Sequence, residues 1–334
     1  MDAAVATPQA ETPLLEVRNL VKYFKLHDDL VSRLAGKTQT LRAVDDISFE
    51  IKQGETLGLV GESGCGKSTT GRLIARLIEP TSGDVAYKGE DLLKFDNRRM
   101  RAARKDIQLV FQDPYSSLNP RKTVMQILGR PLEVHGLAGD WREKRERVLE
   151  LLNLVGLGHE HIDRYPHEFS GGQRQRIAIA RALTVKPDLV IGDEPVSALD
   201  VSVQAQILNL FREMQERFGL TYLFIAHDLS VVRHISDRVA VMYVGKMVET
   251  GPVADVFARP QHPYTQALMA AAPEADPDRP APKLTLKGEV ATPIDPPPGC
   301  RLCKRCPIAT PNCVTDPPPM REMAPGPFAA CHNI

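Results

Sequence analysis

The stretch GESGCGKS, residues 61–68, decides the fold of this chain. It follows the apolar run Thr56–Val60 and opens a predicted helix near Lys67. Two glycines separated by four residues and followed by lysine and serine form the P-loop pattern, in which backbone N–H groups turn inward around phosphate oxygens. Glycine permits this turn, and the N-terminus of the following helix adds N–H groups and a positive dipole end. The stretch therefore predicts a phosphate site between a strand and a helix.

Individual residues of this stretch have distinct chemical tasks. Lys67 would hold the β- and γ-phosphates of a nucleotide, and Ser68 would place its hydroxyl on Mg²⁺, which prefers oxygen ligands. Cys65 lies beside Lys67 at a helix N-terminus, surroundings that lower the pKa of a thiol, although its plainer role is a small spacer. The residues expected to bind the nucleotide are Gly61, Glu62, Ser63, Gly64, Cys65, Gly66, Lys67, Ser68 and Thr69.

Composition is that of a globular protein. The chain has 334 residues, 43% of them hydrophobic, and equal numbers of basic and acidic side chains, 42 each. This balance gives no overall positive field that would hold a nucleic acid. No run approaches the roughly 18–20 apolar residues of a membrane span, and the N-terminus lacks the pattern of a signal peptide. We therefore expect a cytoplasmic protein without a nucleic-acid partner.

Apolar runs of strand length alternate with amphipathic helical stretches up to about residue 271, which is typical of a layered α/β domain. Residues 1–13 are expected to be a flexible N-terminus. The segment Trp141–Val155 has an apolar stripe at helical spacing and lies in a largely helical insert, about residues 113–169. The expected strands are Leu15–Val17, Ile47–Ile51, Thr56–Val60, Asp84–Tyr87, Ile107–Phe111, Leu189–Ile191, Tyr222–Ile225 and Val239–Tyr243.

Two later segments would complete the phosphate site. Leu189 begins an apolar strand that ends in Asp193 and Glu194, at the sheet edge where open α/β proteins bind ligands. Asp193 would hold Mg²⁺, and Glu194 would polarise an attacking water. Ser170 would cap a further helix whose first two residues, both glycine, expose backbone N–H groups to an anion. Since one chain cannot easily bring two helix N-termini to one phosphate, the pattern predicts that two chains share each nucleotide.

These motifs and their order resemble the ATP-binding subunits of ABC transporters over about residues 14–271. The Leu-Ser-Gly-Gly-Gln signature of that family is similar to residues 169–173, with Phe169 in place of leucine. The resemblance implies a P-loop NTPase fold of the α/β class with a RecA-like core, an antiparallel β subdomain and the helical insert. It also implies a head-to-tail dimer in which each ATP lies between one P-loop and the partner's signature, here Ser170, Gly171, Gly172 and Gln173.

The resemblance assigns further roles by motif. Gln112 is similar to the Q-loop residue that touches Mg²⁺ together with Ser68 and Asp193, and His227 to the switch histidine that contacts the γ-phosphate. With Glu194, these two form the expected catalytic group. Phe24 is the favoured aromatic for stacking on adenine, with Tyr23 as the alternative. The D-loop at the dimer seam would be Ser197, Ala198, Leu199 and Asp200.

The flanking segments narrow the resemblance. Residues 262–268, 25–42 and 111–120 are similar to bacterial importers of dipeptides and oligopeptides, a group that includes nickel and glutathione importers. They point to the second ATPase subunit, which pairs with a related ATPase chain and two membrane permease subunits, and indirectly with a substrate-binding protein. The resemblance implies ATP-driven import of di- or oligopeptides at the cytoplasmic face of the inner membrane. The alternatives are import of nickel, glutathione or another small solute, and a soluble ABC ATPase acting on nucleic acid or ribosomes.

The C-terminal segment raises a separate question. Residues 273–327 carry 15 of the 27 prolines, so residues 272–334 are expected to form an irregular Pro/Cys-rich domain. Five of the six cysteines lie there: Cys300, Cys303, Cys306, Cys313 and Cys331. A reducing cytosol disfavours a disulfide framework, which leaves an iron–sulfur cluster, tetrahedral zinc, or unligated or partly paired thiols. The importer resemblance implies a [4Fe–4S] cluster on Cys300, Cys306, Cys313 and Cys331, with Cys303 as an extra.

Overall fold

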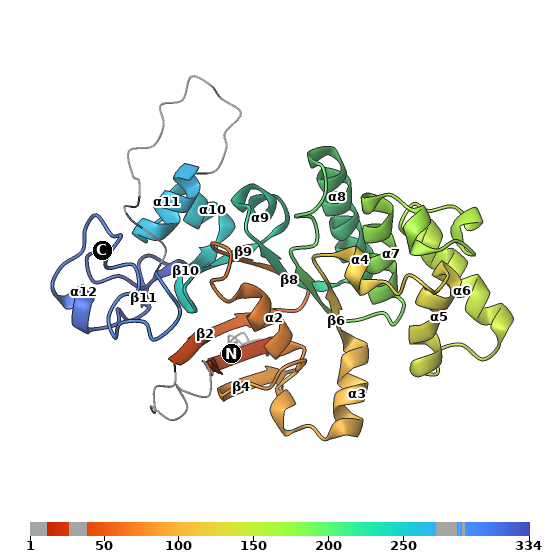
Figure 1. Cartoon of the computed structure of the whole chain (residues 1–334), viewed down its shortest axis with the longest axis horizontal. Helices are drawn as coiled ribbons and strands as arrows, with labels where there is room; N and C mark the ends of the chain where they lie inside the picture. The colour runs from red at the N-terminus through yellow and green to blue at the C-terminus, as the bar shows by residue number, and fades with distance from the viewer. Residues whose placement is uncertain (1–11, 27–38, 272–285, 287, 289–290) are drawn as a thin grey trace, which may run out of the picture.

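The computed structural model describes residues 12–26, 39–271, 286, 288 and 291–334. Most of the expected flexible N-terminus and most of the segment 25–42 lie outside the described residues. A central eight-stranded sheet carries helices, and a smaller antiparallel sheet lies beside it (Figure 1). In the described part of the chain, no helix has both the length and the apolar character needed to cross a bilayer.

Five parallel strands form the middle of the central sheet. Their order is β9-β3-β8-β7-β6, and their bounds are β9 Arg238–Tyr243, β3 Thr56–Val60, β8 Thr221–Ala226, β7 Leu189–Asp193 and β6 Ile107–Val110. Along β7, Val190 packs into one hydrophobic core, whereas Leu189 and Ile191 pack into a second core on the other face. Burial on both faces explains why these strands read as continuous apolar runs, and the five strands predicted there are confirmed.

Antiparallel strands extend this sheet at one edge. Strand β10, Lys246–Pro252, pairs with β9, and the short strands β12, Phe328–Ala329, and β11, Arg321–Glu322, follow it. Strand β10 was not among the predicted strands, because Glu249 and the Gly251-Pro252 pair interrupt its apolar pattern. The described C-terminal residues therefore join the central sheet through the pair Glu249 and Ala329.

The smaller sheet is antiparallel, with strand order β2-β1-β4-β5. Its strands are β2 Gln39–Ile51, β1 Leu15–Leu26, β4 Ser82–Tyr87 and β5 Glu90–Asp91. The predicted strands at Leu15, Ile47 and Asp84 cover only parts of them, since the outer halves of β1 and β2 carry half-exposed polar residues that no apolar window detects. The pairing of β1 with β2 also shifts register near Leu20 and Lys22.

Helices cover both faces of the central sheet. The helix α2, Lys67–Ile74, begins directly after the P-loop pattern, as predicted. Its Leu73 and Ile74 pack into the core that the two sheets share. The other helices of the main body are α3 Asn97–Asp106, α8 Val201–Phe218, α9 Leu229–Ile235, α10 Val253–Ala258 and α11 Pro263–Ala271.

The predicted helical insert is helical in the structure. Its helices are α4 Pro114–Ser117, α5 Val124–Val134 and α6 Trp141–Leu154, and the signature helix α7, Gly171–Leu183, follows. Helix α6 matches the predicted segment Trp141–Val155 to within one residue, and Val148, Leu152 and Val155 are fully buried. Figure 1 shows α5, α6 and α7 together at the end of the molecule opposite the C-terminus.

Candidate functional site

The P-loop turns at a glycine that no other residue could replace without displacement. Gly66 precedes α2 in a left-handed conformation with φ 111°. A Cβ atom at this position would lie 2.1 Å from the carbonyl oxygen of Ala43 on β2. The backbone therefore needs glycine both for its conformation and for this close approach.

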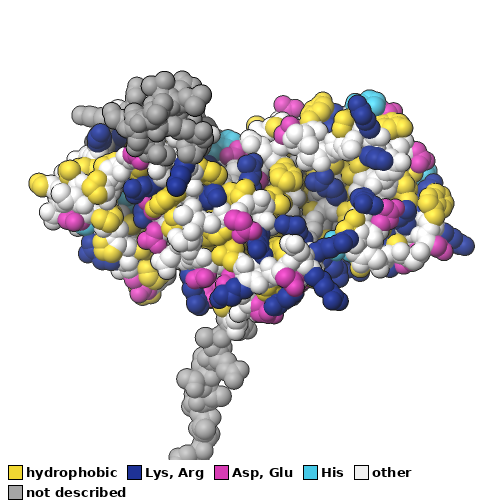
Figure 2. All heavy atoms as spheres, turned by 60° about the horizontal axis from the view of Figure 1, so that its bottom comes forward, with side chains coloured by type: hydrophobic (Ala, Val, Ile, Leu, Met, Phe, Trp, Pro, Cys, Tyr) yellow, Lys and Arg dark blue, Asp and Glu magenta, His cyan; other side chains and the backbone are white. Residues whose placement is uncertain are grey.

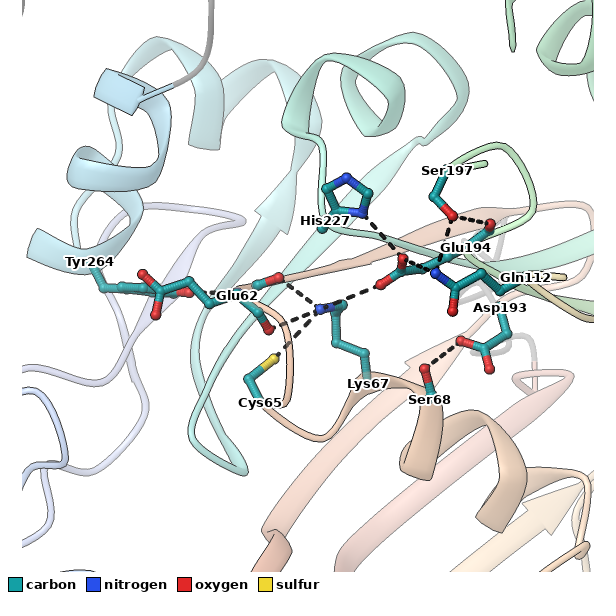
Figure 3. Close-up of polar contacts among 11 residues, drawn as sticks. Glu62, Cys65, Lys67, Ser68, Gln112, Asp193, Glu194, Ser197, His227 and Tyr264 are labelled. Carbon is teal, nitrogen blue, oxygen red and sulfur yellow. Dashed lines mark hydrogen bonds and ion pairs between the residues drawn. The ribbon is translucent and has the colours of Figure 1, made fainter. Parts of the chain in front are cut away.

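Lys67 points from the first residue of α2 back into the loop (Figure 3). Its buried Nζ donates hydrogen bonds to the carbonyl oxygens of Gly61 at 2.7 Å and Glu62 at 3.0 Å, and lies 3.9 Å from the Oε1 atom of Glu194. An ammonium held in this position presents a point charge to whatever anion occupies the loop.

Ser68 and Asp193 face each other across the site. The Ser68 hydroxyl donates to Oδ1 of Asp193 at 2.6 Å, which joins α2 to the carboxyl end of β7. Burial raises the pKa of Asp193, against the lowering effects of Ser68 and the nearby Arg72. A hydroxyl and a desolvated carboxylate at this edge are the oxygen donors that suit Mg²⁺. The donor set therefore fits the expected ion.

Glu194 is the meeting point of four elements. Its Oε2 atom accepts from Nε2 of Gln112 at 3.1 Å and lies 3.2 Å from Nδ1 of His227, which follows β8. Gln112 also donates to the Ser197 hydroxyl at 3.3 Å. The structure thus brings the three expected catalytic residues together with Lys67 and the first residue of the expected D-loop (Figure 3).

The backbone at Glu194 is strained. Glu194 has a φ of 49°, in a region that a residue with a side chain seldom adopts, and its N–H donates to the carbonyl oxygen of Ile225 at 3.0 Å. Such strain costs about 1–3 kcal/mol and persists only where neighbouring contacts hold it. It turns the Glu194 carboxylate toward the P-loop.

Two residues behind the P-loop were not assigned a role from sequence. The fully buried Tyr264 accepts a hydrogen bond at its hydroxyl oxygen from the Glu62 N–H at 2.8 Å. His262 is also buried, and its Nδ1 accepts from the Tyr264 N–H at 3.1 Å. Burial lowers the pKa of His262 to about 4. Sequence reasoning singled out residues 262–268 only as a family segment, because no pattern in them indicates contact with a loop two hundred residues earlier.

The two aromatic candidates for adenine stacking differ in their surroundings. The Tyr23 hydroxyl donates to Oδ1 of Asp45 at 2.5 Å, and the Arg42 guanidinium lies 5.4 Å from its ring centre. The next residue on β1, Phe24, is exposed, with the Lys22 ammonium 5.0 Å from its ring centre. Phe24 is therefore an exposed ring, whereas Tyr23 is engaged in a polar network.

The signature residues lie at the start of α7. Ser170 is the N-cap, as predicted: its hydroxyl accepts from the Gln173 N–H at 3.3 Å, and Gln173 Oε1 accepts from the Ser170 N–H at 3.0 Å. A Cβ atom on Gly172 would lie 2.4 Å from Cγ1 of Val203 on α8, so a larger residue would displace Val203. No hydrogen bond among the described residues joins these residues to residues 61–68. Within one chain, the two predicted anion sites therefore remain separate.

Cys65 corrects one expectation. It is buried, and this burial raises the pKa of its thiol despite the neighbouring Lys67, which acts in the opposite direction. The sequence surroundings alone indicated a lowered pKa, because they do not reveal burial. The structure supports the role of a small spacer.

The five C-terminal cysteines are free thiols gathered in one region. Burial, followed by nearness to Cys313, Cys306 and Cys331, raises the pKa of Cys300 to about 11. The Cys300 N–H also donates to the Cys313 carbonyl at 2.8 Å. Hydrogen bonds involving Thr310 and Asn333 lower the pKa of Cys313 against the effect of burial. Over the described ranges, however, no three Cys, His, Asp or Glu side chains form a group that could hold a metal ion, so the expected cluster has no support in this geometry.

Comparisons with known proteins agree with these features. The model of the ABC transporter family matches residues 44–197, and the model named oligopeptide/dipeptide transporter, C-terminal region, matches residues 248–313. The chain is 52% identical to the oligopeptide transport ATP-binding protein AppF of Bacillus subtilis, over 98% of this chain and 99% of the relative. It is 49% identical to the dipeptide transport ATP-binding protein DppF of Haemophilus influenzae, over 97% of each chain.

A solved structure has the same fold. The dimeric ATP-binding cassette MJ0796, bound to ADP and Pi, is 29% identical and superposes with a TM-score of 0.63, covering 72% of this chain and 98% of its own. The expected ABC ATPase fold is thereby confirmed.

Proposed function

Because the chain belongs to the ATP-binding subunits of ABC transporters of the oligopeptide and dipeptide type, we propose that it binds and hydrolyses ATP to power peptide import. The observation that carries this proposal is the convergence of Lys67, Gln112 and His227 on the carboxylate of Glu194. Phosphoryl transfer to water needs positioning and charge neutralisation more than covalent chemistry. This group of side chains supplies both.

We assign each residue one task. Lys67 and the backbone of residues 61–69 hold the triphosphate, and Phe24 stacks on adenine. Glu194 orients the attacking water and accepts its proton, and His227, which lies beside Glu194, contacts the γ-phosphate. Mg²⁺, when bound to Ser68, Gln112 and Asp193, supplies neutralisation of phosphate charge.

The test is a pair of measurements on the assembled transporter. ATP hydrolysis should require both this chain and the membrane subunits, and should increase when a receptor loaded with peptide is added. Hydrolysis that responds to nickel or glutathione, and not to peptides, would replace the peptide proposal by the small-solute alternative. A soluble ATPase acting on ribosomes or nucleic acid is not favoured, because relatives over nearly the full length are named transport proteins.

Each nucleotide would lie between two ATPase chains. Ser170, Gly171, Gly172 and Gln173, at the start of α7, would contact the nucleotide of a partner, with residues 197–200 at the seam. Val201, directly after this D-loop, is 81% exposed, which suits a residue that a partner covers. We propose a related but different ATPase chain as this partner.

A permease subunit would dock on the helical insert. A groove of about 990 Å³ lies beside α6, and its lining combines apolar side chains, among them Leu132, Leu151 and Leu154, with charged ones, among them Glu146 and Arg217. A mixed apolar and charged lining suits a short amphipathic helix. On the face drawn in Figure 2, basic and acidic side chains are intermixed across the surface. We propose that a cytoplasmic helix of the permease lies in this groove and holds the chain at the cytoplasmic face of the inner membrane.

The groove can be tested with one substitution and a matched control. Leu154→Glu replaces an apolar side chain of the groove lining with a charged one and should abolish copurification of permease subunits with the tagged chain. Trp141→Glu lies on the same helix but outside the groove and should leave copurification intact. Equal recovery of permease with both variants would exclude this docking site.

We further propose that Cys300, Cys306, Cys313 and Cys331 bind a [4Fe–4S] cluster, with zinc as the alternative. Support comes from the spacing of these four cysteines in the sequence and from the family resemblance of this segment. Iron, sulfide and zinc analysis of anaerobically purified protein, together with visible absorption, tests this. Protein without stoichiometric metal would leave these residues as unligated thiols.

A further inference from the structure

The turn at residues 300–306 carries two arginines. Their side chains extend from the C-terminal segment and contact the main body beside the proposed nucleotide site. Arg301 is 8% exposed, and Arg305 is mostly buried. Buried guanidinium groups are costly unless their donors are matched by acceptors. Their partners therefore indicate what this turn holds in place.

Arg301 connects the turn to the adenine side of the site. Its Nη2 donates to Oδ2 of Asp45, and its Nη1 donates to the carbonyl oxygen of Val244. The other carboxylate oxygen of Asp45 accepts from the Tyr23 hydroxyl at 2.5 Å. Tyr23 is adjacent to Phe24 on β1, so a chain of three side chains links the C-terminal turn to the proposed adenine platform.

Val244 and Gly245 connect the same arginine to the P-loop. Val244 has a φ of 44°, an outlier for a β-branched residue, and Arg301 donates to its carbonyl oxygen. The Gly245 N–H donates to the Cys65 carbonyl at 2.8 Å, and the Gly245 carbonyl accepts from the Asp45 N–H at 2.8 Å. A Cβ atom on Gly245 would lie 3.1 Å from Nη1 of Arg301, so the strained turn and the arginine fit closely.

Arg305 reaches the phosphate side directly. Its Nη1 lies 3.3 Å from Oε2 of Glu62 and 3.3 Å from the Tyr243 hydroxyl. The backbone carbonyl of Glu62 accepts from Lys67. Arg305 therefore fixes Glu62, and the backbone carbonyl of Glu62 in turn helps to orient Lys67.

We propose that the turn at residues 300–306 is a positioning element of the nucleotide site, in which Arg301 fixes the adenine side through Asp45 and Arg305 fixes the P-loop through Glu62. This inference rests on the proposed function as an ATP-binding chain. Arginine suits position 301 because its planar fork holds two N–H donors in a fixed geometry toward a carboxylate and a carbonyl, whereas lysine offers one ammonium on a flexible stem.

The test compares binding of two probes, ATP and inorganic tripolyphosphate, to the full-length chain. Arg301→Met should weaken ATP binding by about 2- to 30-fold, the range typical of residues that act through others, and should spare tripolyphosphate. Arg305→Met should weaken both probes. The matched control is Lys304→Met, which removes an exposed cation from the same turn and should change neither.

A second measurement guards against loss of folding. Arg301→Lys and Asp45→Asn make smaller changes. In their double variant, the loss of ATP affinity should be smaller than the sum of the losses in the two single variants, because the two side chains act as one unit. Thermal unfolding of each variant identifies any that has lost its structure.

Two different results separate failure of this inference from failure of the proposed function. If Lys67→Ala loses ATP but the Arg301 and Arg305 variants bind both probes as the Lys304 variant does, the positioning role is wrong and the ATP site stands. Equal loss of ATP and tripolyphosphate in Arg301→Met would refute the adenine-side role. If the unaltered chain binds no ATP, both proposals are overturned.

Discussion

The P-loop half of the site and the signature end of α7 differ in where their polar groups find partners. Around the P-loop, Lys67 donates to the carbonyl oxygen of Gly61, and Ser68 donates to Asp193 at the end of β7. Glu194 accepts from Gln112, which follows β6, and lies within hydrogen-bond distance of His227, which follows β8. At the start of α7, the side chains of Ser170 and Gln173 accept from each other's backbone N–H groups, and the remaining first-turn N–H groups have no acceptor within the helix. One half of the site is assembled by the chain itself. The other half presents donors for an anion that a second chain would bring.

The largest expected effect separates binding from chemistry in the P-loop half. Glu194→Gln keeps the hydrogen bond from Gln112 but removes the base, so ATP should bind while hydrolysis falls at least about a hundredfold. Turnover in the complete transporter and equilibrium ATP binding measure the two quantities. Glu213→Gln, at an exposed position of α8, is the control. Near-normal turnover of Glu194→Gln would remove Glu194 from its proposed role.

Lys67→Ala should act on binding itself. Loss of a charge-assisted contact costs about 1.5–3 kcal/mol, which corresponds to roughly a ten- to hundredfold weaker Kd for ATP. Titration with labelled ATP checks this, with the exposed Lys52→Ala as the control. An unchanged Kd would mean that the loop does not hold the triphosphate.

Ser170→Ala should leave binding by a single chain unchanged and lower hydrolysis in the assembled transporter by about tenfold or more, because a donor to the partner's phosphate is lost. It also removes a helix cap worth about 1 kcal/mol. Thr123→Ala is the matched control, since Thr123 and Gln126 form the same capping box at the start of α5. The comparison fails if both variants lose equal activity, or if Ser170→Ala weakens ATP binding by one chain.

The smallest expected effect concerns pH and the support behind the P-loop. The folded-state pKa of His262 is about 4, below its ordinary value of 6.5, so the unfolded chain takes up the proton first on acidification. Stability is therefore complete above about pH 6.5 and is lost as the pH falls toward 4, by about 1 kcal/mol at pH 5.5. Hydrogen exchange should show α11 losing protection at pH 5.5 before α7 does.

The control for this prediction is His262→Asn, whose side-chain oxygen can still accept from the Tyr264 N–H. Its unfolding free energy should be flatter than that of the parent between pH 7 and 5.5. Identical pH profiles would show that His262 is not responsible for the acid sensitivity.

The amino-acid sequence by itself determined the local elements of this protein. The apolar runs fixed the buried strands, the glycine spacing fixed the turn before α2, and Ser170 fixed the start of α7, because each depends on neighbours within a few residues. Contacts between distant segments were decided only by the tertiary structure. The bond from Glu62 to Tyr264, the burial that raises the pKa of Cys65, and the reach of Arg301 to Asp45 all depend on how the strands and the C-terminal turn pack. Periodicity carries information about which face of an element is buried, but none about which residue meets it there.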